Sequence, residues 1–168
     1  MPKILIATHN SWKEKLFASL LNGSGFETVL LKEIATPPIP PIENGTTVIE
    51  NALIKARHYH STAYPWVFSD DTGLEIDALN GEPGVQTRRW GGRLPDDISD
   101  QAWLEYLLLR MNNVPHNQRT ASFVDGWALI DPQYNEYTHL TRSSFHIATH
   151  SVRPMLPGSP IMAVALGI

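Results

Sequence analysis

The segment Trp66–Gly81 constrains the fold of this chain more than any other part of the sequence. An apolar run leads to two adjacent carboxylates, Asp70 and Asp71, and a hydroxyl residue and a glycine follow them. This order predicts that a buried strand ends at the two acids and that the chain turns there. Ligands of α/β proteins bind outside the carboxyl ends of such strands, and carboxylates there suit a hard divalent cation. A solvated turn is the alternative that this segment alone leaves open.

Size and composition exclude several classes of protein. With 168 residues, the chain is expected to form one domain over residues 1–168. A net charge of −4 argues against a nucleic-acid partner. The absence of cysteine excludes disulfides, thiol catalysis and cysteine metal sites. Because no apolar run approaches the roughly 18–20 residues of a membrane span, we expect a soluble cytoplasmic protein with no membrane partner.

Hydrophobic periodicity predicts alternating strands and helices. Strands are expected at residues 3–8, 29–31, 66–69, 74–79, 121–130 and 136–149. Helices are expected to begin at Ser11 and Thr47, where each residue has a Glu three positions later in a capping-box pattern, and at Ser99 or Asp100. Residues at helical spacing in the first helix are Trp12, Leu16, Leu20, Phe17 and Leu21. Two loops are expected, a proline-rich one at 36–41 and a tight turn at Asn80-Gly81.

The junction between the first strand and the first helix is a candidate phosphate site. Free N–H groups and a partial positive charge at a helix N-terminus attract anions. Lys13 falls in the first helical turn, where a cation opposes the helix dipole at a cost of roughly 0.3–1 kcal/mol. We therefore predict that Lys13 binds phosphate and that Thr8 and Asn10 donate hydrogen bonds to it. The alternative is that Lys13 is simply exposed, and that Glu14 offsets the unfavourable interaction of its charge with the helix dipole.

Two further groups could contribute to such a site. Glu43 lies in a loop before the second helix and is a candidate second carboxylate for a metal shared with Asp71. Alternatively, Glu43 is an ordinary acidic residue of a loop near the start of a helix and binds no metal.

Three arginines, Arg88, Arg89 and Arg93, surround Trp90 in a glycine-rich loop. Cations beside an aromatic ring indicate a nucleotide or phosphate contact, and a solvated loop is the alternative.

Taken together, these segments resemble the inosine triphosphate pyrophosphatase (ITPase) family of nucleoside triphosphate pyrophosphatases. The similarity extends over about residues 3–125, and its specific part is the Asp-Asp segment. The matching motifs are Thr8-x-Asn10-x-x-Lys13, Glu43-x-Gly45-x-Thr47-x-x-Glu50-Asn51-Ala52 with Lys55-Ala56, Asp70-Asp71-Thr72-Gly73-Leu74, Asp77-Ala78-Leu79-x-Gly81-x-Pro83-Gly84-Val85 and Arg89-Trp90-x-Gly92.

The resemblance implies an α/β fold with an elongated, long mixed β-sheet flanked by helices, two lobes and a central cleft, in a homodimer. It implies Mg²⁺-dependent hydrolysis of (d)ITP- and XTP-like nucleotides to monophosphate and pyrophosphate. By position, Asp71 resembles the family's residue that acts as general base and metal ligand, and Glu43 resembles the residue that acts as a metal ligand. The implied substrate contacts are Thr8, Asn10, Lys13, Thr72 and Arg89.

The resemblance breaks down in the last third of the chain. The Phe-Gly-(Tyr/Trp)-Asp motif, the following lysine and the Ser-His-Arg motif, with which the family reads the base, are not found. We therefore expect a divergent or shortened C-terminal part. If it is shortened, residues 161–168 are expected to form an exposed, unpaired strand. Candidate substitutes for base reading are Trp127, His146 and His150. Two other functions stay open: a Maf-like pyrophosphatase with another base preference, and an inactive nucleotide-binding protein.

Overall fold

The computed structural model describes residues 1–34 and 39–167. Their contacts divide them into two compact units, which we describe separately. Unit 1 consists of Met1–Asp71 and Asp125–Thr141, and unit 2 consists of Thr72–Val124 and Arg142–Ile168.

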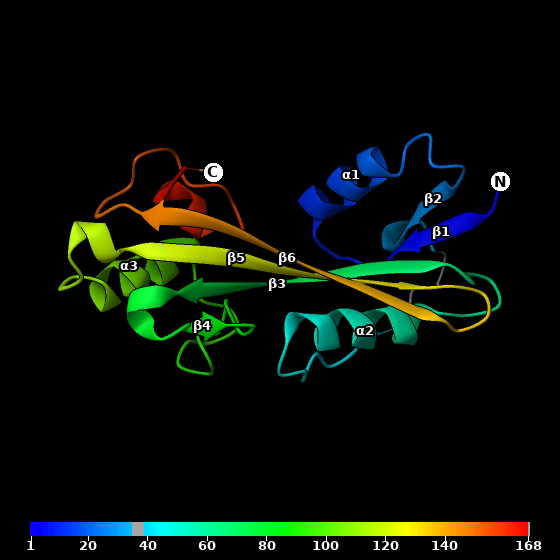
Figure 1. The fold of residues 1–168 in the computed structure, drawn as a ribbon, viewed down its shortest axis with the longest axis horizontal. Helices are drawn as coiled ribbons and strands as arrows, with labels where there is room; N and C mark the ends of the chain where they lie inside the picture. Colours follow the sequence, from blue (N-terminus) through cyan, green and yellow to red (C-terminus); the bar gives the residue numbers. More distant parts are fainter. Residues whose placement is uncertain (35–38, 168) are drawn as a thin grey trace. The chain divides into compact units, whose positions relative to one another are not determined.

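The secondary structure is that of an α/β protein (Figure 1). The helices are α1 (Ser11–Leu20), α2 (Val48–Tyr59) and α3 (Asp100–Arg110). The strands are β1 (Lys3–Ile6), β2 (Glu27–Leu30), β3 (Val67–Ile76), β4 (Pro83–Gly84), β5 (Thr120–Ile130), β6 (Glu136–Ile147) and β7 (Ala165–Leu166). Short 3₁₀ helices are η1 (Leu31–Glu33), η2 (Asp77–Leu79), η3 (His116–Gln118) and η4 (Pro160–Ala163).

The strands form a mixed sheet in the order β2-β1-β3-β5-β6-β7, and β4 pairs with β3. Strand β1 is parallel to β2 and to β3, whereas β4 and β7 are antiparallel to their partners. The predicted α/β fold with a mixed sheet and flanking helices is confirmed. The single domain over residues 1–168 and the central cleft stay predictions, and the proline-rich loop lies partly outside the described residues.

The prediction that a strand ends at the two acids is wrong. Strand β3 runs through Asp70 and Asp71 and continues to Ile76, and it includes the segment expected to form a separate half-buried strand. The Asp-Thr-Gly composition is that of a turn, but the segment lies within a strand that has β1 and β5 as neighbours in the sheet and that pairs with β4 just beyond the segment, and this pairing keeps the chain extended. The tight turn follows later, where Asn80 and Gly81 both have positive φ.

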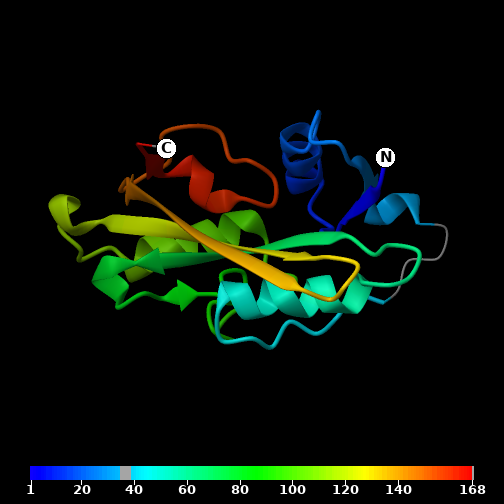
Figure 2. The same cartoon turned by 45° about the vertical axis from the view of Figure 1, so that its right-hand side comes forward.

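In unit 1, α1 and α2 cover opposite faces of the sheet (Figures 1 and 2). Side chains of a strand alternate between its two faces, and β3 shows this alternation in its contacts. Phe68 packs edge-on against Phe17 of α1, with ring centroids 4.8 Å apart. Its neighbour Ser69 donates a hydrogen bond to the Ala52 carbonyl of α2, 2.5 Å away. Two adjacent residues of β3 therefore contact two different helices.

Helix α1 differs from the prediction in its cap and in its buried face. Its N-cap is Asn10, not Ser11, because the Asn10 side chain accepts hydrogen bonds from the backbone of Trp12 and Lys13. The apolar stripe of Trp12, Leu16 and Leu20 is exposed, and the helix buries Phe17 instead.

Helix α2 confirms the predicted capping box, in which Thr47 and Glu50 bond reciprocally. Its buried Ala52 and Ala56 belong to a core cluster with residues of β1, β3 and β5. Strand β5 approaches the first turn of α2 closely at Gly126, where an added Cβ would lie 2.7 Å from the Ile49 nitrogen. A glycine is therefore required at this contact.

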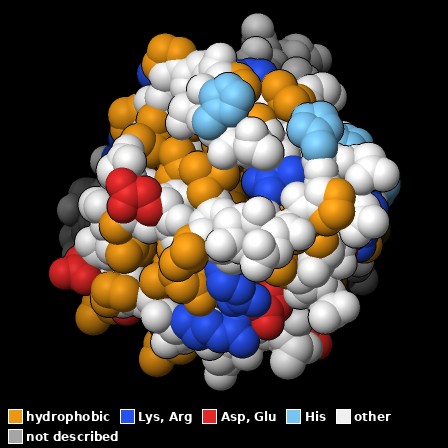
Figure 3. Space-filling view, turned by 90° about the vertical axis from the view of Figure 1, so that its left-hand side faces the viewer, with side chains coloured by type: hydrophobic (Ala, Val, Ile, Leu, Met, Phe, Trp, Pro, Cys, Tyr) orange, Lys and Arg blue, Asp and Glu red, His pale blue; other side chains and the backbone are white. Residues whose placement is uncertain are grey.

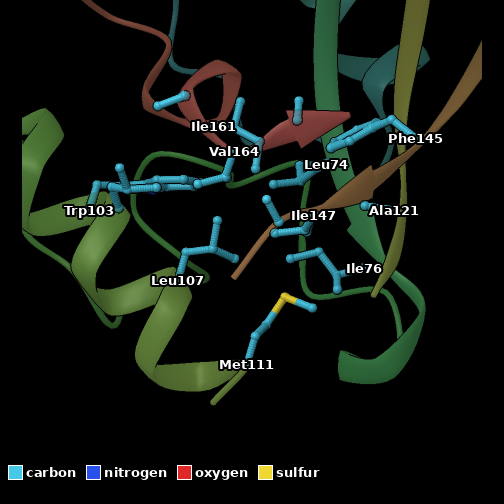
Figure 4. Close-up of a cluster of buried hydrophobic side chains, with 14 of the residues drawn as sticks. Leu74, Ile76, Trp103, Leu107, Met111, Ala121, Phe145, Ile147, Ile161 and Val164 are labelled. Atoms are coloured by element: carbon cyan, nitrogen blue, oxygen red, sulfur yellow. The ribbon is translucent and has the colours of Figure 1, made fainter. Parts of the chain in front are cut away.

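Unit 2 has its own core, formed by one side of α3 with β3, β5, β6 and the C-terminal segment (Figure 4). The labelled side chains in the close-up include Trp103 and Leu107 of α3, which face Ile161 and Val164 of that segment. The prediction of an exposed, unpaired C-terminal strand is wrong. Residues 160–163 form η4, and β7 pairs antiparallel with the end of β6, because the apolar side chains of this segment fill the core.

A buried arginine holds the end of α3 to the β5–β6 pair within unit 2. The Arg119 side chain is 2% exposed. Its guanidinium donates hydrogen bonds to the carbonyls of Met111, Ile147 and Ala148 at 2.5–3.1 Å. Burial lowers the pKa of Arg119. The arginine thus satisfies carbonyls that would otherwise be buried without a donor.

No helix among residues 1–34 and 39–167 is long and apolar enough to cross a membrane.

Replacing Arg119 tests this structural role. Arg119→Met should lower the free energy of unfolding by about 2–4 kcal/mol, because several buried carbonyls lose their donor. The measurement is urea denaturation followed by circular dichroism. Arg142→Met is the control, because Arg142 is exposed and donates its hydrogen bond to the side chain of Glu75, not to buried carbonyls. An equal, small loss in both variants would contradict the role.

Candidate active site

The candidate site in unit 1 is centred on Asp71, whose carboxylate faces α2. Asn51 of α2 donates a hydrogen bond from Nδ2 to Asp71 Oδ2 over 2.9 Å. The Lys55 ammonium, one turn further along α2, lies 3.7 Å from Asp71 Oδ1. The same ammonium lies 2.9 Å from Glu43 Oε2. The structure therefore brings together the two predicted metal ligands, Glu43 and Asp71, around one lysine.

Asn51 also fixes the loop that carries Glu43. Its Oδ1 atom accepts a hydrogen bond from the Gly45 N–H, 2.8 Å away. An added Cβ at Gly45 would lie only 2.7 Å from this oxygen, so the loop requires glycine there. The buried Asn51 side chain thus connects the Glu43 loop to Asp71, because its amide accepts a hydrogen bond from the loop and donates one to the Asp71 carboxylate.

The environment of Asp71 raises its pKa above the usual carboxyl value. Burial is the largest cause, and the Glu43 carboxylate adds to the rise. The Lys55 ammonium, the hydrogen bond from Asn51 and the charge of Lys13 act in the opposite direction. A carboxylate with a raised pKa is a stronger base than an exposed one, as a general base requires.

The other face of β3 carries a second pair. The Lys13 ammonium of α1 forms an ion pair with Asp70, whose side chain is 2% exposed. The second oxygen of this carboxylate, Oδ1, is buried without a hydrogen-bond partner. The two adjacent acids therefore do not bind one cation together, and each faces the lysine of a different helix.

The predicted phosphate loop is built at the start of α1. Thr8 follows β1 and is buried, and its Oγ1 accepts a hydrogen bond from the Asn10 N–H, 3.3 Å away. Asn10 caps the helix in place of the expected Ser11, and Lys13 lies in the first turn, as expected. Since the Asn10 side-chain oxygen accepts two backbone hydrogen bonds, its Nδ2 is the group that can donate to a ligand.

The remaining predicted contacts, Thr72 and Arg89, belong to unit 2. Thr72 follows Asp71 directly in β3. Arg89 is half-exposed and pairs with Asp96 at 3.3 Å. Their contact with substrate stays a prediction.

The predicted nucleotide or phosphate contact of the arginines around Trp90 stays a prediction, but the structure shows that Trp90 itself is a core residue. Its side chain is fully buried against Trp103 and Tyr106. Arg88 pairs with Asp100, and Arg93 pairs with Glu82 at 2.6 Å, so both have structural partners. On the face of the molecule in Figure 3, basic side chains lie in small separate groups and form no continuous patch.

The donors present fit Mg²⁺, which is commonly bound by one or two carboxylates together with water and substrate phosphates. Glu43 and Asp71 are two such carboxylates, and both form ion pairs with the Lys55 ammonium. Within residues 1–34 and 39–167, no group of three or more His, Cys, Asp or Glu side chains is arranged around a metal position. A cage made by the protein alone is thus not the type of site seen here.

The sequence of the chain is similar to those of known proteins. The chain is 40% identical over 137 residues to a dITP/XTP pyrophosphatase of Corynebacterium efficiens, covering 80% of this chain and 65% of that protein. It is 44% identical over 123 residues to a dITP/XTP pyrophosphatase of Photobacterium profundum, covering 73% of this chain and 60% of that protein. The chain therefore spans about three fifths of the length of these curated relatives.

Solved structures share the fold. A nucleoside-triphosphatase / dITP/XTP pyrophosphatase from Mycobacterium abscessus superposes with a TM-score of 0.73 at 33% identity, over 98% of this chain and 83% of that one. A HAM1 protein from Coxiella burnetii gives a TM-score of 0.81 at 27% identity, over 98% and 81%. The model of the Ham1 family matches residues 4–149, most of the chain and all of the site in unit 1. The chain thus belongs to the Ham1 family.

Proposed function

We propose that this protein is a Mg²⁺-dependent nucleoside triphosphate pyrophosphatase. It hydrolyses (d)ITP- and XTP-like purine nucleotides to the monophosphate and pyrophosphate. The observation that carries the proposal is the convergence of Glu43 and Asp71 on Lys55, beside the Thr8–Lys13 loop. The curated relatives described above, which are named dITP/XTP pyrophosphatases, support the choice of substrate.

Asp71 is the proposed general base. Its carboxylate takes a proton from the water that attacks the α-phosphorus, the α–β phosphoanhydride bond breaks, and pyrophosphate leaves. Burial raises the pKa of Asp71, which strengthens it as a base. Asn51 holds one of its oxygens, so the carboxylate keeps a fixed direction during the reaction.

Glu43 and Asp71 would hold the Mg²⁺ ion, which when bound neutralises phosphate charge and acidifies bound water. Lys13 balances the negative charge that develops on the phosphate oxygens. We propose Thr8, Asn10, Thr72 and Arg89 as further substrate contacts.

Two alternative functions are compared with the proposed one. A Maf-like pyrophosphatase would share the metal chemistry but prefer other bases, and an inactive nucleotide-binding protein would bind without turnover. The ion pairs of Lys55 with Glu43 and Asp71 favour an enzyme over a binding protein, because holding the largely buried charges of Lys55 and Asp71 in the protein costs stability. A cytoplasmic homodimer follows from the family resemblance.

Replacing the proposed base tests the mechanism. Asp71→Asn should lower kcat by at least about 100-fold, because the amide cannot accept the water proton. Pyrophosphate release is measured with Mg²⁺ and ITP, XTP, dITP, GTP, ATP, dTTP and UTP in parallel. Asp97→Asn, at an exposed position of unit 2, is the control and should keep full activity.

The panel separates the alternatives. Release from ITP and XTP that Asp71→Asn abolishes supports the proposal. Preference for dTTP or UTP would favour the Maf-like alternative. Nucleotide binding without release by folded protein would contradict an enzyme, and near-normal turnover by Asp71→Asn would remove Asp71 from the mechanism.

Replacing Asn51 tests the positioning of Asp71. Asn51→Ala should lower kcat roughly tenfold, with a smaller change in KM, because the base loses its fixed direction but remains present. It should also lower the free energy of unfolding by about 1–2 kcal/mol, because the Gly45 N–H loses its acceptor. Steady-state kinetics and urea denaturation measure both, and an unchanged kcat in a destabilised variant would leave Asn51 with a structural role only.

A further inference from the structure

Lys55 lies where the two proposed metal ligands meet. It belongs to the third turn of α2, and its side chain is 14% exposed. Its ammonium lies 2.9 Å from Glu43 Oε2 and 3.7 Å from Asp71 Oδ1. A cation between two carboxylates occupies the position that a divalent ion would need in order to bind both.

The backbone on each side of this ammonium is fixed. Asp71 is part of β3, and Asn51 holds both its carboxylate and the loop that carries Glu43. Lys55 itself extends from the middle of a helix whose start is capped. The carboxylates can therefore exchange one cation for another with little change in the backbone, and the flexible lysine side chain is the part that can move.

The charge of Lys55 also has a role before metal binds. The exposed Glu43 carboxylate repels the largely buried Asp71 carboxylate when the two are brought together, and burying Asp71 without a counter-charge is costly. The charge of Lys13 also acts on Asp71, but the Lys13 ammonium is paired with Asp70, whereas the Lys55 ammonium forms ion pairs with both Glu43 and Asp71. Lys55 is thus the cation that keeps Glu43 beside Asp71 in the metal-free protein.

We propose that Lys55 is a built-in competitor for the metal ion: its ammonium holds Glu43 and Asp71 together in the free protein, and a divalent ion binds by breaking these two ion pairs. The inference rests on the proposed assignment of Glu43 and Asp71 as metal ligands. It has two consequences. The metal-free site is already assembled, and its affinity for Mg²⁺ is lower than the two carboxylates alone would give.

The test compares Mg²⁺ binding to three proteins by isothermal titration calorimetry in the absence of nucleotide. Lys55→Met removes the ammonium and keeps an unbranched side chain that suits a helix. Lys3→Met removes one positive charge from an exposed position of the same unit and leaves the Lys55 ion pairs intact, so it measures the effect of net charge. We expect Lys55→Met to lower the Kd for Mg²⁺ by about tenfold or more, and Lys3→Met to lower it by less than about threefold.

Equal gains in affinity in the two variants would overturn the proposal, because charge alone would then explain them. Weaker or unchanged binding by Lys55→Met, or no Mg²⁺ binding by any of the three proteins, would overturn it too. Circular dichroism shows whether Lys55→Met is folded. Its melting temperature without metal should lie below that of the wild type, and added Mg²⁺ should raise it by more than it raises that of the wild type.

A second measurement needs no variant. Wild-type protein is treated briefly with acetic anhydride, with and without Mg²⁺, and acetylation of each lysine is read by mass spectrometry. Displacement by Mg²⁺ should raise acetylation of Lys55 severalfold, whereas acetylation of the exposed Lys3 should not change. An unchanged or lower rate at Lys55 would contradict displacement. Pyrophosphate release measured on the same samples separates the two proposals, since Mg²⁺-dependent release without any change at Lys55 would leave the proposed function standing and reject the competitor role.

Discussion

The candidate site depends on the alternation of side chains along β3. Because successive residues of a strand face opposite sides of a sheet, the carboxylates of Asp70 and Asp71 form their ion pairs with different lysines. Asp70 faces α1 and its Lys13, while Asp71 faces α2 with Asn51 and Lys55. Adjacent acids that look like a single pair in the sequence are therefore two separate charge centres. A shift of one residue in the register of β3 would exchange them and destroy both.

The two acids of β3, Asp70 and Asp71, are each largely buried beside a lysine. Burying a carboxylate costs several kcal/mol unless a cation or hydrogen-bond donors compensate, so each lysine is needed for the folded state as well as for any reaction. The compensation is incomplete, since Asp70 Oδ1 has no hydrogen-bond partner and the pKa of Asp71 stays raised. Incompletely compensated charge is typical of sites that are completed by a ligand.

Much of the fold could be predicted from the sequence, because the relevant signals are local. The capping box at Thr47, the cap at Ser99 and the positive-φ turn at Asn80 all act within a few residues. The cap at Asn10 was assigned to the next residue, since two neighbouring polar residues can both cap a helix and only the hydrogen bonds distinguish them. The continuity of β3 is set by its neighbouring strands, which a local turn composition does not reveal.

The site could be predicted only in part, because some of its residues are marked by local signals and others acquire their roles through packing. Glu43, Asp71 and Lys13 stand out as charges at junctions of elements, but the roles of Asn51 and Lys55 arise only when α2 packs on β3. Both lie on the buried side of a helix four residues apart, and this spacing next to a predicted metal ligand is the signal that could have identified them. The burial of Arg119 had no sequence signal, since all of its partners are backbone carbonyls.

The central claim is that Glu43 and Asp71 form one cation site that Lys55 fills in the metal-free protein. The most direct measurement is a crystal structure with Mn²⁺, in which anomalous scattering locates the ion without prior assumptions. The account predicts a peak bound by one oxygen of each carboxylate, with the Lys55 ammonium moved away from both. A peak elsewhere, or a peak at this position with both Lys55 ion pairs intact, would contradict it.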